Sequence, residues 1–262
     1  MARVQMAVVE RYMELVDGLS ETARAALENV IMSTDLRNPG SRWEIADLLA
    51  GALNVSVLEA SELATIFYGG MRERYYNGTA EYVAEPFTSF VEESARRIID
   101  GMLSKVGEIY TEEQLADDLG QMVDREMKVG AAETIIGNAQ ADPAKPRYAR
   151  VPTGAETCAF CMMLASRGFE YHSRETAGEM EKYHAFCDCA IVPEFDADGV
   201  DGYEPDDYYA LYMAARKNTA DDSEAYRAWE AMTDEERARY KGFSDYYTKL
   251  VLHTMREQYG LK

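Results

Sequence analysis

The chain has 262 residues, of which 47% are hydrophobic and 11% aromatic, and it carries a formal net charge of −20 at pH 7. This composition is typical of a folded protein, and the length allows one large domain or two small ones. The sequence has no run of eighteen apolar residues and no cluster of lysines or arginines, so it predicts neither a membrane span nor direct contact with a nucleic-acid backbone.

Residues 1–142 predict an N-terminal helical region. The opening stretch MARVQMAVVERYMELVDG has Glu10 and Glu14 inside its apolar pattern, whereas a signal peptide has an uninterrupted apolar run. We therefore expect a first helix in a protein made in the cytoplasm. Further along, TSFVEESARRIIDGML has apolar residues three and four positions apart. Five or six helices are expected before residue 140, and the last runs from Thr111 to about Ala139.

Capping and stop signals place the expected helix ends. The stops are RNPG near residues 37–40, YNG at 76–78 and EPF at 85–87. Five pairs fit the capping box, in which each side chain satisfies the other residue's free backbone N–H: Ser41/Glu44, Ser56/Glu59, Ser89/Glu92, Thr111/Gln114 and Thr233/Glu236.

The pattern changes at ADPAKPRYARVP, whose prolines end the helical region. Residues 143–196 contain the short β-like pieces RYARVP, FEYHS and AIVPEF, and CAFCMMLASRG reads as a short helix that ends at Gly168. Residues 197–262 then form an acidic helical tail, in which Pro205 suits a first helical turn. The predicted fold class is α+β: mostly helical, with a small antiparallel β element stapled by zinc.

All four cysteines lie in the middle region, in the order C-x2-C followed by H-x2-C-x-C. Thiolates and imidazole are the ligands that zinc prefers, and a structural zinc takes four of them. The five candidate metal ligands are Cys158, Cys161, His184, Cys187 and Cys189. We favour the first two cysteines and Cys187, with His184 and Cys189 competing for the fourth place. Two alternatives are a disulfide such as Cys158–Cys187, which a cytoplasmic protein rarely forms, and four free thiols in a core.

The expected role of the zinc is structural, because it would hold together a sheet too small to have a sufficient core of its own. A catalytic zinc keeps three protein ligands and an open position. The sequence has no H-E-x-x-H, and no histidine or cysteine precedes Cys158, which excludes a zinc deaminase. We therefore predict no catalytic residues. In the enzyme alternative, His172 or a carboxylate would serve as the base.

The stretches VPTGAETCAFCMMLASRGFEYHS and YHAFCDCAIVPEF resemble the Mu F-like head morphogenesis domain of tailed bacteriophages, in the version found in phages of actinobacteria. The resemblance covers about residues 146–196. Asp188 stands where many members of that family have arginine.

The resemblance implies a structural minor capsid protein of the virion interior, present in the host cytoplasm during assembly. It would act near the portal in capsid assembly, genome packaging or ejection. Its partners would be portal and capsid or scaffold proteins. The resemblance implies no enzyme activity for the protein itself. The alternatives are a zinc-dependent hydrolase or effector toxin, and a non-phage cytoplasmic adaptor with a zinc knuckle.

Overall fold

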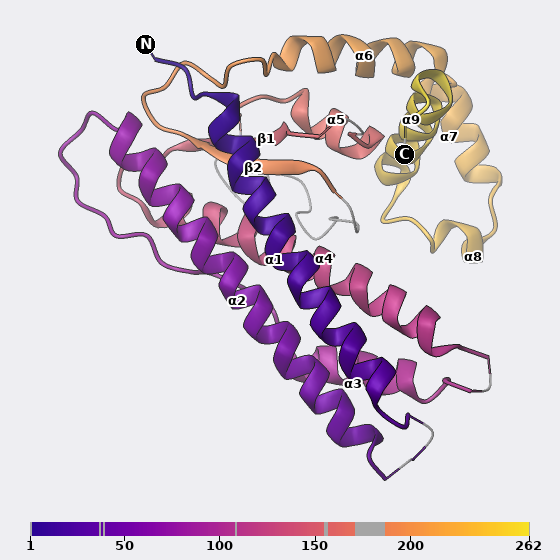
Figure 1. Ribbon diagram of the computed structural model, residues 1–262. Helices are drawn as coiled ribbons and strands as arrows, with labels where there is room; N and C mark the ends of the chain where they lie inside the picture. The colour runs from indigo at the N-terminus through magenta and orange to yellow at the C-terminus, as the bar shows by residue number, and fades with distance from the viewer. Residues whose placement is uncertain are drawn as a thin grey trace.

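The protein is mostly helical with a small two-stranded sheet, as a computed structural model shows (Figure 1). The structure describes residues 2–36, 38, 40–107, 109–154, 157–170 and 187–261. Its helices are α1 (Met6–Ser33), α2 (Arg42–Tyr75), α3 (Glu92–Leu103), α4 (Glu112–Ala141), α5 (Ala159–Ala165), α6 (Pro205–Asn218), α7 (Asp222–Ala231), α8 (Asp234–Arg237) and α9 (Phe243–Tyr259). Its strands are β1 (Arg147–Pro152) and β2 (Cys189–Glu194). The predicted α+β class is confirmed.

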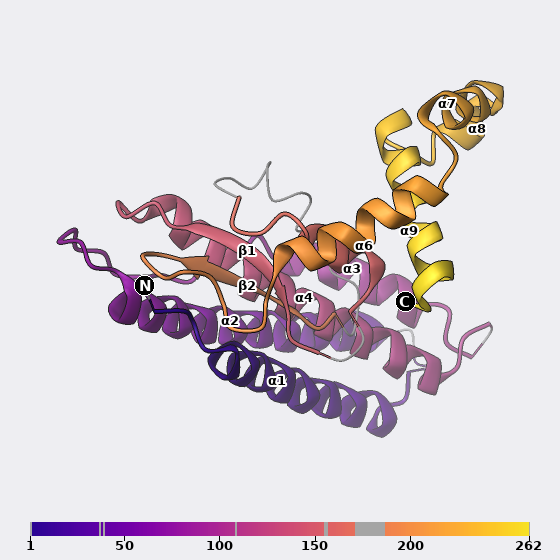
Figure 2. The ribbon, with the colours of Figure 1, turned by 90° about the horizontal axis from the view of Figure 1, so that it is seen from above.

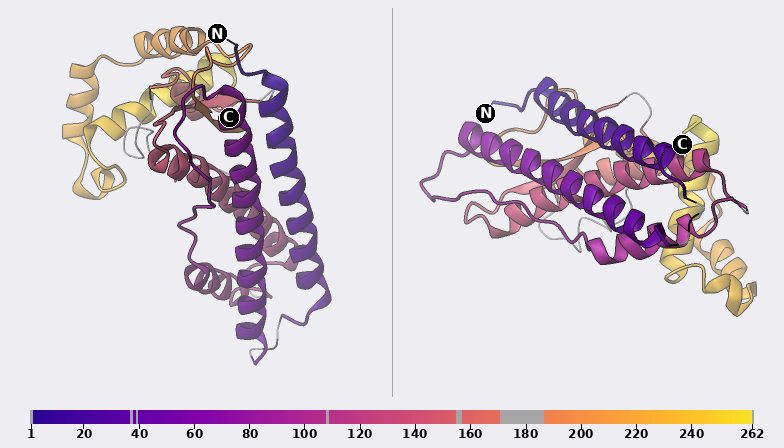
Figure 3. Two further views of the ribbon diagram at one scale, coloured as in Figure 1. Left: turned by 90° about the vertical axis from the view of Figure 1, so that its left-hand side faces the viewer. Right: turned by 60° about the horizontal axis from the view of Figure 1, so that its bottom comes forward.

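The long helices α1, α2 and α4 form the main bundle, and α3 packs on α2 (Figures 1 and 3). Leu49, Leu53 and Val57 are buried at four-residue spacing in α2, which is the pattern that buries one side of a helix. Tyr12 of α1 stacks on Phe67 of α2 with ring centroids 4.2 Å apart. This apolar seam fixes the two helices side by side.

The expectation of five or six helices before residue 140 is wrong, because the described residues form four there. The serine of the Ser56/Glu59 pair lies inside α2, where the apolar spacing continues without a break. Ser41 caps α2 without a side-chain hydrogen bond, and α3 begins at Glu92 rather than directly after Ser89. The capping boxes of α4 and α8 form as predicted, at Thr111/Gln114 and Thr233/Glu236.

Residues 77–91 form an extended strap along α4, so EPF lies within the strap rather than at a helix end. Three side chains of α4 hydrogen-bond alternate residues of the strap: Asn138 holds Glu85, Thr134 holds Phe87 and Glu133 holds Ser89. The helix side chains thereby satisfy backbone groups that a helix would have paired internally. These hydrogen bonds hold the segment extended along α4.

The two strands pair antiparallel, from Arg147 opposite Glu194 to Pro152 opposite Cys189. The sheet lies beside the layer of α1 and α2 (Figure 2), and it packs on these helices and on α4. RYARVP and AIVPEF are thus confirmed as strands, whereas Phe169 and Glu170 of the FEYHS piece are not in a strand and its other residues lie outside the described part. Near the N-terminus, Val4 donates to the carbonyl of Gly199 at 2.9 Å, which ties the first residues to the segment after β2.

The C-terminal helices pack on α5 through a second apolar cluster. Ala159, Met163 and Leu164 of α5 contact buried residues of α6 and α9, including Ala215 and Val251. Gly168 ends the α5 turn with φ of +60°, as its place in the sequence predicts. The division at residues 142 and 196 into three regions stays a prediction as far as independent folding is concerned.

Candidate metal centre

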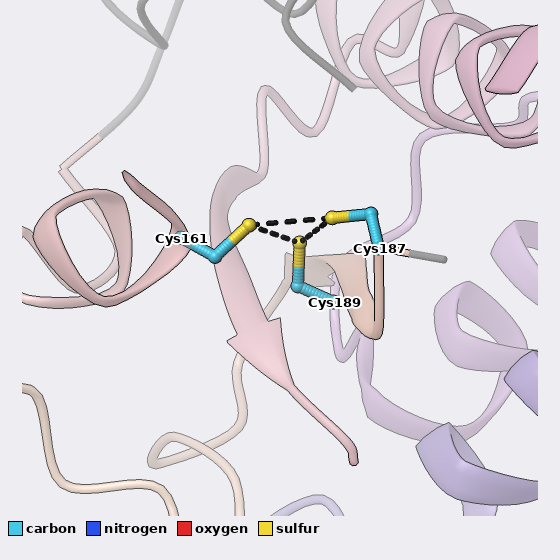
Figure 4. Close-up of side chains that lie close together, drawn as sticks. All are labelled: Cys161, Cys187 and Cys189. Carbon is cyan, nitrogen blue, oxygen red and sulfur yellow. Dashed lines mark hydrogen bonds between the residues drawn. The ribbon is translucent and has the colours of Figure 1, made fainter. Parts of the chain in front are cut away.

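Three buried thiols meet where α5 approaches the start of β2 (Figure 4). The Sγ atom of Cys161 lies 3.3 Å from that of Cys187 and 3.1 Å from that of Cys189, and the last two are 3.1 Å apart. All three residues are at most 1% exposed. The sulfurs therefore form a compact triangle that is closed off from solvent.

Local structure explains why these cysteines converge. In C-x2-C, Cys158 is the N-cap of α5 and its Sγ accepts the backbone N–H of Cys161 at 3.4 Å. Cys187 and Cys189 are two positions apart in extended chain, so their side chains point to the same side. The short helix thus presents one thiol to the thiol of Cys187, just before β2, and to that of Cys189, the first residue of β2.

The structure brings together three of the five predicted ligands. Cys158 is also buried, and its side chain hydrogen-bonds that of Cys161, but it is not among the three mutually close thiols. His184 and His172 lie outside the described residues. None of the four cysteines forms a disulfide. Ligation of a metal by any of the five residues stays a prediction.

The sulfur triangle fits a metal that prefers thiolates. Zinc–sulfur bonds of about 2.3 Å in a tetrahedron place the sulfurs about 3.8 Å apart. The observed separations of 3.1 to 3.3 Å require the sulfurs to spread by only about half an ångström. A soft, all-thiol donor set selects zinc, copper(I) or iron–sulfur chemistry over magnesium or calcium.

A buried arginine faces the three sulfurs. The Nη1 of Arg150 lies 3.2 Å from the sulfur of Cys189 and 3.4 Å from that of Cys161, and the residue is 1% exposed. Arg150 pairs with Ile191 and Cys189 with Pro152, so the strand register makes Arg150 and Cys189 diagonal neighbours on one face of the sheet. A buried guanidinium requires a compensating negative charge, which a thiolate cluster supplies.

Sequence reasoning gave Arg150 no chemical role, although the sequence contains the signal. Tyr148, Arg150 and Pro152 alternate along RYARVP, and both neighbours of Arg150 in that alternation are buried. A charge at an interior position of a short strand indicates a buried counter-ion nearby. The partner is Cys189, which the antiparallel register places opposite Pro152, two residues along the strand from Arg150.

The surroundings affect the three thiols differently. Hydrogen bonds from Cys161 and Cys189, with the Arg150 charge, lower the pKa of Cys187 to about 2. The pKa of Cys161 is raised, chiefly by its hydrogen bond with Cys158, and burial raises the pKa of Cys189. The Arg150 charge thus favours a thiolate within the cluster, and a bound metal ion would deprotonate further thiols.

Asp188 lies between the two β-side cysteines and organises the loop after β1. Its carbonyl accepts the backbone N–H of Thr153 at 2.9 Å. A Cβ on Gly154 would lie 2.4 Å from a carboxylate oxygen of Asp188, so that glycine allows the close approach. The acidic residue at this position thus makes contacts within the chain.

Comparison with known proteins places the chain among phage proteins. The sequence model of the family described as VG15 protein matches residues 3–215. The Gene 15 protein of Mycobacterium phage D29 is 36% identical over 110 residues, covering 30% of this chain and 40% of that protein. The Gene 15 protein of Mycobacterium phage L5 is 37% identical over 111 residues, covering 28% of this chain and 38% of that protein. The chain thus spans about two fifths of these curated relatives. No solved structure matches the chain.

Proposed function

The chain belongs to the VG15 protein family, which includes phage proteins, and on this premise we propose that it is a minor capsid protein of the Mu F type. It acts near the portal vertex of the phage head, in capsid assembly, genome packaging or genome ejection. The role is structural: the protein docks on other head proteins, and a zinc ion fixes the shape of the docking element. It occupies the virion interior, and the host cytoplasm during assembly.

The observation that carries this proposal is the closed thiol cluster that joins α5 to β2. The cluster lies within residues 146–196, the part of the sequence that resembles the Mu F-like domain. A zinc ion held by buried thiolates adds folding free energy to a small element. The two-stranded sheet is short, so a metal that ties it to α5 would make it rigid enough to serve as a docking surface.

Burial of the cluster favours a structural over a catalytic metal. A hydrolytic zinc needs a position open to water and substrate. Here the three sulfurs are at most 1% exposed and Arg150 lies against them, which favours a closed site over an open one. Membership of a phage family also favours the capsid role over an adaptor unrelated to phage.

The proposed partners are the portal and the capsid or scaffold proteins. The net charge of −20 disfavours direct binding to the packaged genome, because phosphate contacts need clustered lysines and arginines. The same charge favours docking on a basic protein surface.

A nonsense mutation in this gene of the phage tests the proposal. We expect purified wild-type virions to contain the protein in a few copies, and the mutant to give heads that lack it and that package or eject DNA poorly. Quantitative mass spectrometry of virions and procapsids provides the measurement. Absence of the protein from both particles, with normal heads in the mutant, would refute a capsid role.

A further inference from the structure

One face of α2 carries large apolar side chains that no other described element covers. Leu48, Val55, Leu58 and Ile66 are between 40% and 72% exposed. Their spacing of seven, three and eight residues keeps them on one side of the helix. Figures 1 and 3 show α2 along the outside of the bundle. We call these four residues the outer face of α2.

The contacts of α2 with its neighbours lie to either side of the outer face. Towards α3, Asn54 donates to the carboxylate of Glu92 at 2.9 Å. Towards α1, Phe67 stacks on Tyr12. Residues on these two sides and on the α4 side are buried, including Leu53 and Val57. The other sides of α2 are therefore packed inside the protein, whereas the outer face stays exposed.

The charged residues that α2 itself carries along the outer face are all acidic. Between residues 43 and 71, α2 contains Glu44, Asp47, Glu59 and Glu62 and no lysine or arginine. Asp47 lies 3.8 Å from Arg96 of α3. The other three carboxylates are exposed and take part in no ion pair within the described part of the chain. The outer face of α2 and the exposed glutamates beside its apolar residues are therefore complementary to a surface that carries both apolar and basic side chains.

Two glycines next to the outer face of α2, beyond Ile66, also favour a helical partner. A Cβ placed on Gly69 or Gly70 would meet nothing within 4 Å, so packing inside the chain does not require glycine at either position. Each glycine inside a helix costs about 1 kcal/mol relative to alanine. Small residues beside the exposed Ile66 let the backbone of a partner helix approach closely.

We propose that the outer face of α2 binds an amphipathic helix of another protein, one that carries lysines or arginines beside its apolar residues. A helix laid against such a face would place anchors at three- and four-residue spacing. This inference rests on α2 alone and holds whether or not the thiol cluster binds a metal.

Two other occupants fit the same surface less well. A second copy of the chain would bring the same carboxylates to the contact, and like charges across an interface are repulsive. An anionic lipid surface would repel them too. Among the described helices α2 is the one long and apolar enough to cross a membrane, but 44% of its most apolar window is buried inside the protein.

Binding of a synthetic helical peptide tests the proposal. The probe has leucines at three- and four-residue spacing flanked by lysines, and its matched control has glutamates in place of the lysines. We expect the wild-type chain to bind the lysine peptide only. Val55→Ser combined with Ile66→Ser should weaken binding about tenfold, because two apolar contacts are lost. Glu59→Gln combined with Glu62→Gln should weaken it and reduce its salt dependence.

Variants elsewhere on the surface provide the control. Val83 and Ile109 are 82% and 80% exposed and lie outside α2, and their serine variants should bind the peptide as the wild type does. Equal binding by the Val55→Ser/Ile66→Ser variant and the wild type would overturn the proposal. So would tight binding to vesicles of anionic lipid, or a concentration-dependent dimer in sedimentation, if either is lost in that same variant.

Discussion

Arg150 donates a hydrogen bond from Nη1 to the sulfur of Cys189 over 3.2 Å, across the diagonal of the two-stranded sheet. The pair joins a buried cation to a thiol cluster, so each group has its charge balanced by the other. The relationship links the strand register to the chemistry of the site. A slip of one residue would turn Arg150 to the opposite face of the sheet.

Replacing Arg150 should therefore destabilise the hairpin. Arg150→Met leaves the thiolates without their counter-ion, and we expect a loss of about 3 kcal/mol in the free energy of unfolding, with faster release of a bound metal. Chemical denaturation and metal-release kinetics provide the measurements. Arg147→Met on the same strand is the control, because Arg147 is half-exposed beside Glu194 and should cost less than about 1 kcal/mol. Equal losses in the two variants would contradict the counter-ion role.

Cys161→Ser should remove the metal and loosen residues 146–196, while much of the N-terminal bundle keeps its structure. The other side of α5 packs on α6 and α9, so the C-terminal helices should loosen as well. Hydrogen exchange read by mass spectrometry would show which segments lose protection. Unchanged heat stability and metal content in this variant would count against a metal site at the thiol cluster.

The fourth ligand can be assigned by two substitutions. Cys158 is the nearest further thiol, because its side chain hydrogen-bonds Cys161. Serine is itself a good N-cap, so Cys158→Ser keeps the cap of α5 and removes only a metal ligand. We expect Cys158→Ser to weaken zinc binding by at least about tenfold, whereas His184→Asn retains it. The reverse result in a competition titration would assign the fourth place to His184.

The strap along α4 should depend on Asn138. This side chain is fully buried and hydrogen-bonds the backbone N–H and carbonyl of Glu85 and the hydroxyl of Tyr82. Asn138→Ala leaves these groups unpaired, so we expect a loss of about 2 to 3 kcal/mol and faster amide exchange in residues 77–91. Asn54→Ala, which removes an exposed contact with Glu92, should change stability little. Similar exchange in the two variants would show that the strap is held by other contacts.

The contribution of Lys128 to the free energy of unfolding should depend on pH at alkaline pH. Burial lowers its pKa, but the carboxylates of Asp124 and Asp17 outweigh burial and raise the pKa above the ordinary value of 10.5. Because the folded value is the higher one, the stabilisation is complete below about pH 10.5 and is lost as the pH rises through the folded value. The difference in unfolding free energy between the wild type and Lys128→Met should stay constant from about pH 8 to pH 10 and narrow above. Narrowing already below pH 9 would contradict this sign.

The sequence predicts the parts of this fold that local signals determine. The strands at RYARVP and AIVPEF, the helix that ends at Gly168 and the two capping boxes at Thr111 and Thr233 follow from turn chemistry, alternation and side-chain caps. The strap could not be predicted, because the side chains that hold it extended come from α4, about fifty residues away.

The candidate site, too, can be predicted from the sequence only in part. Its five residues can be proposed from spacing and ligand chemistry. The grouping of Cys189 rather than Cys158 with Cys161 and Cys187 depends on how α5 meets β2, which no local signal contains. The contact of Arg150 with the sulfurs likewise requires the strand register. Spacing within the sequence identifies the candidate residues, but it does not determine which distant segments come together in the fold.

Zinc content, measured by native mass spectrometry on protein purified without chelator, shows whether the thiol cluster is a structural metal site. We expect one tightly held zinc ion per chain, and cysteines that react with a thiol reagent only after the ion is stripped. A chain that carries no metal, with all four thiols reactive in the folded protein, would contradict a structural zinc site and remove the physical basis proposed for docking.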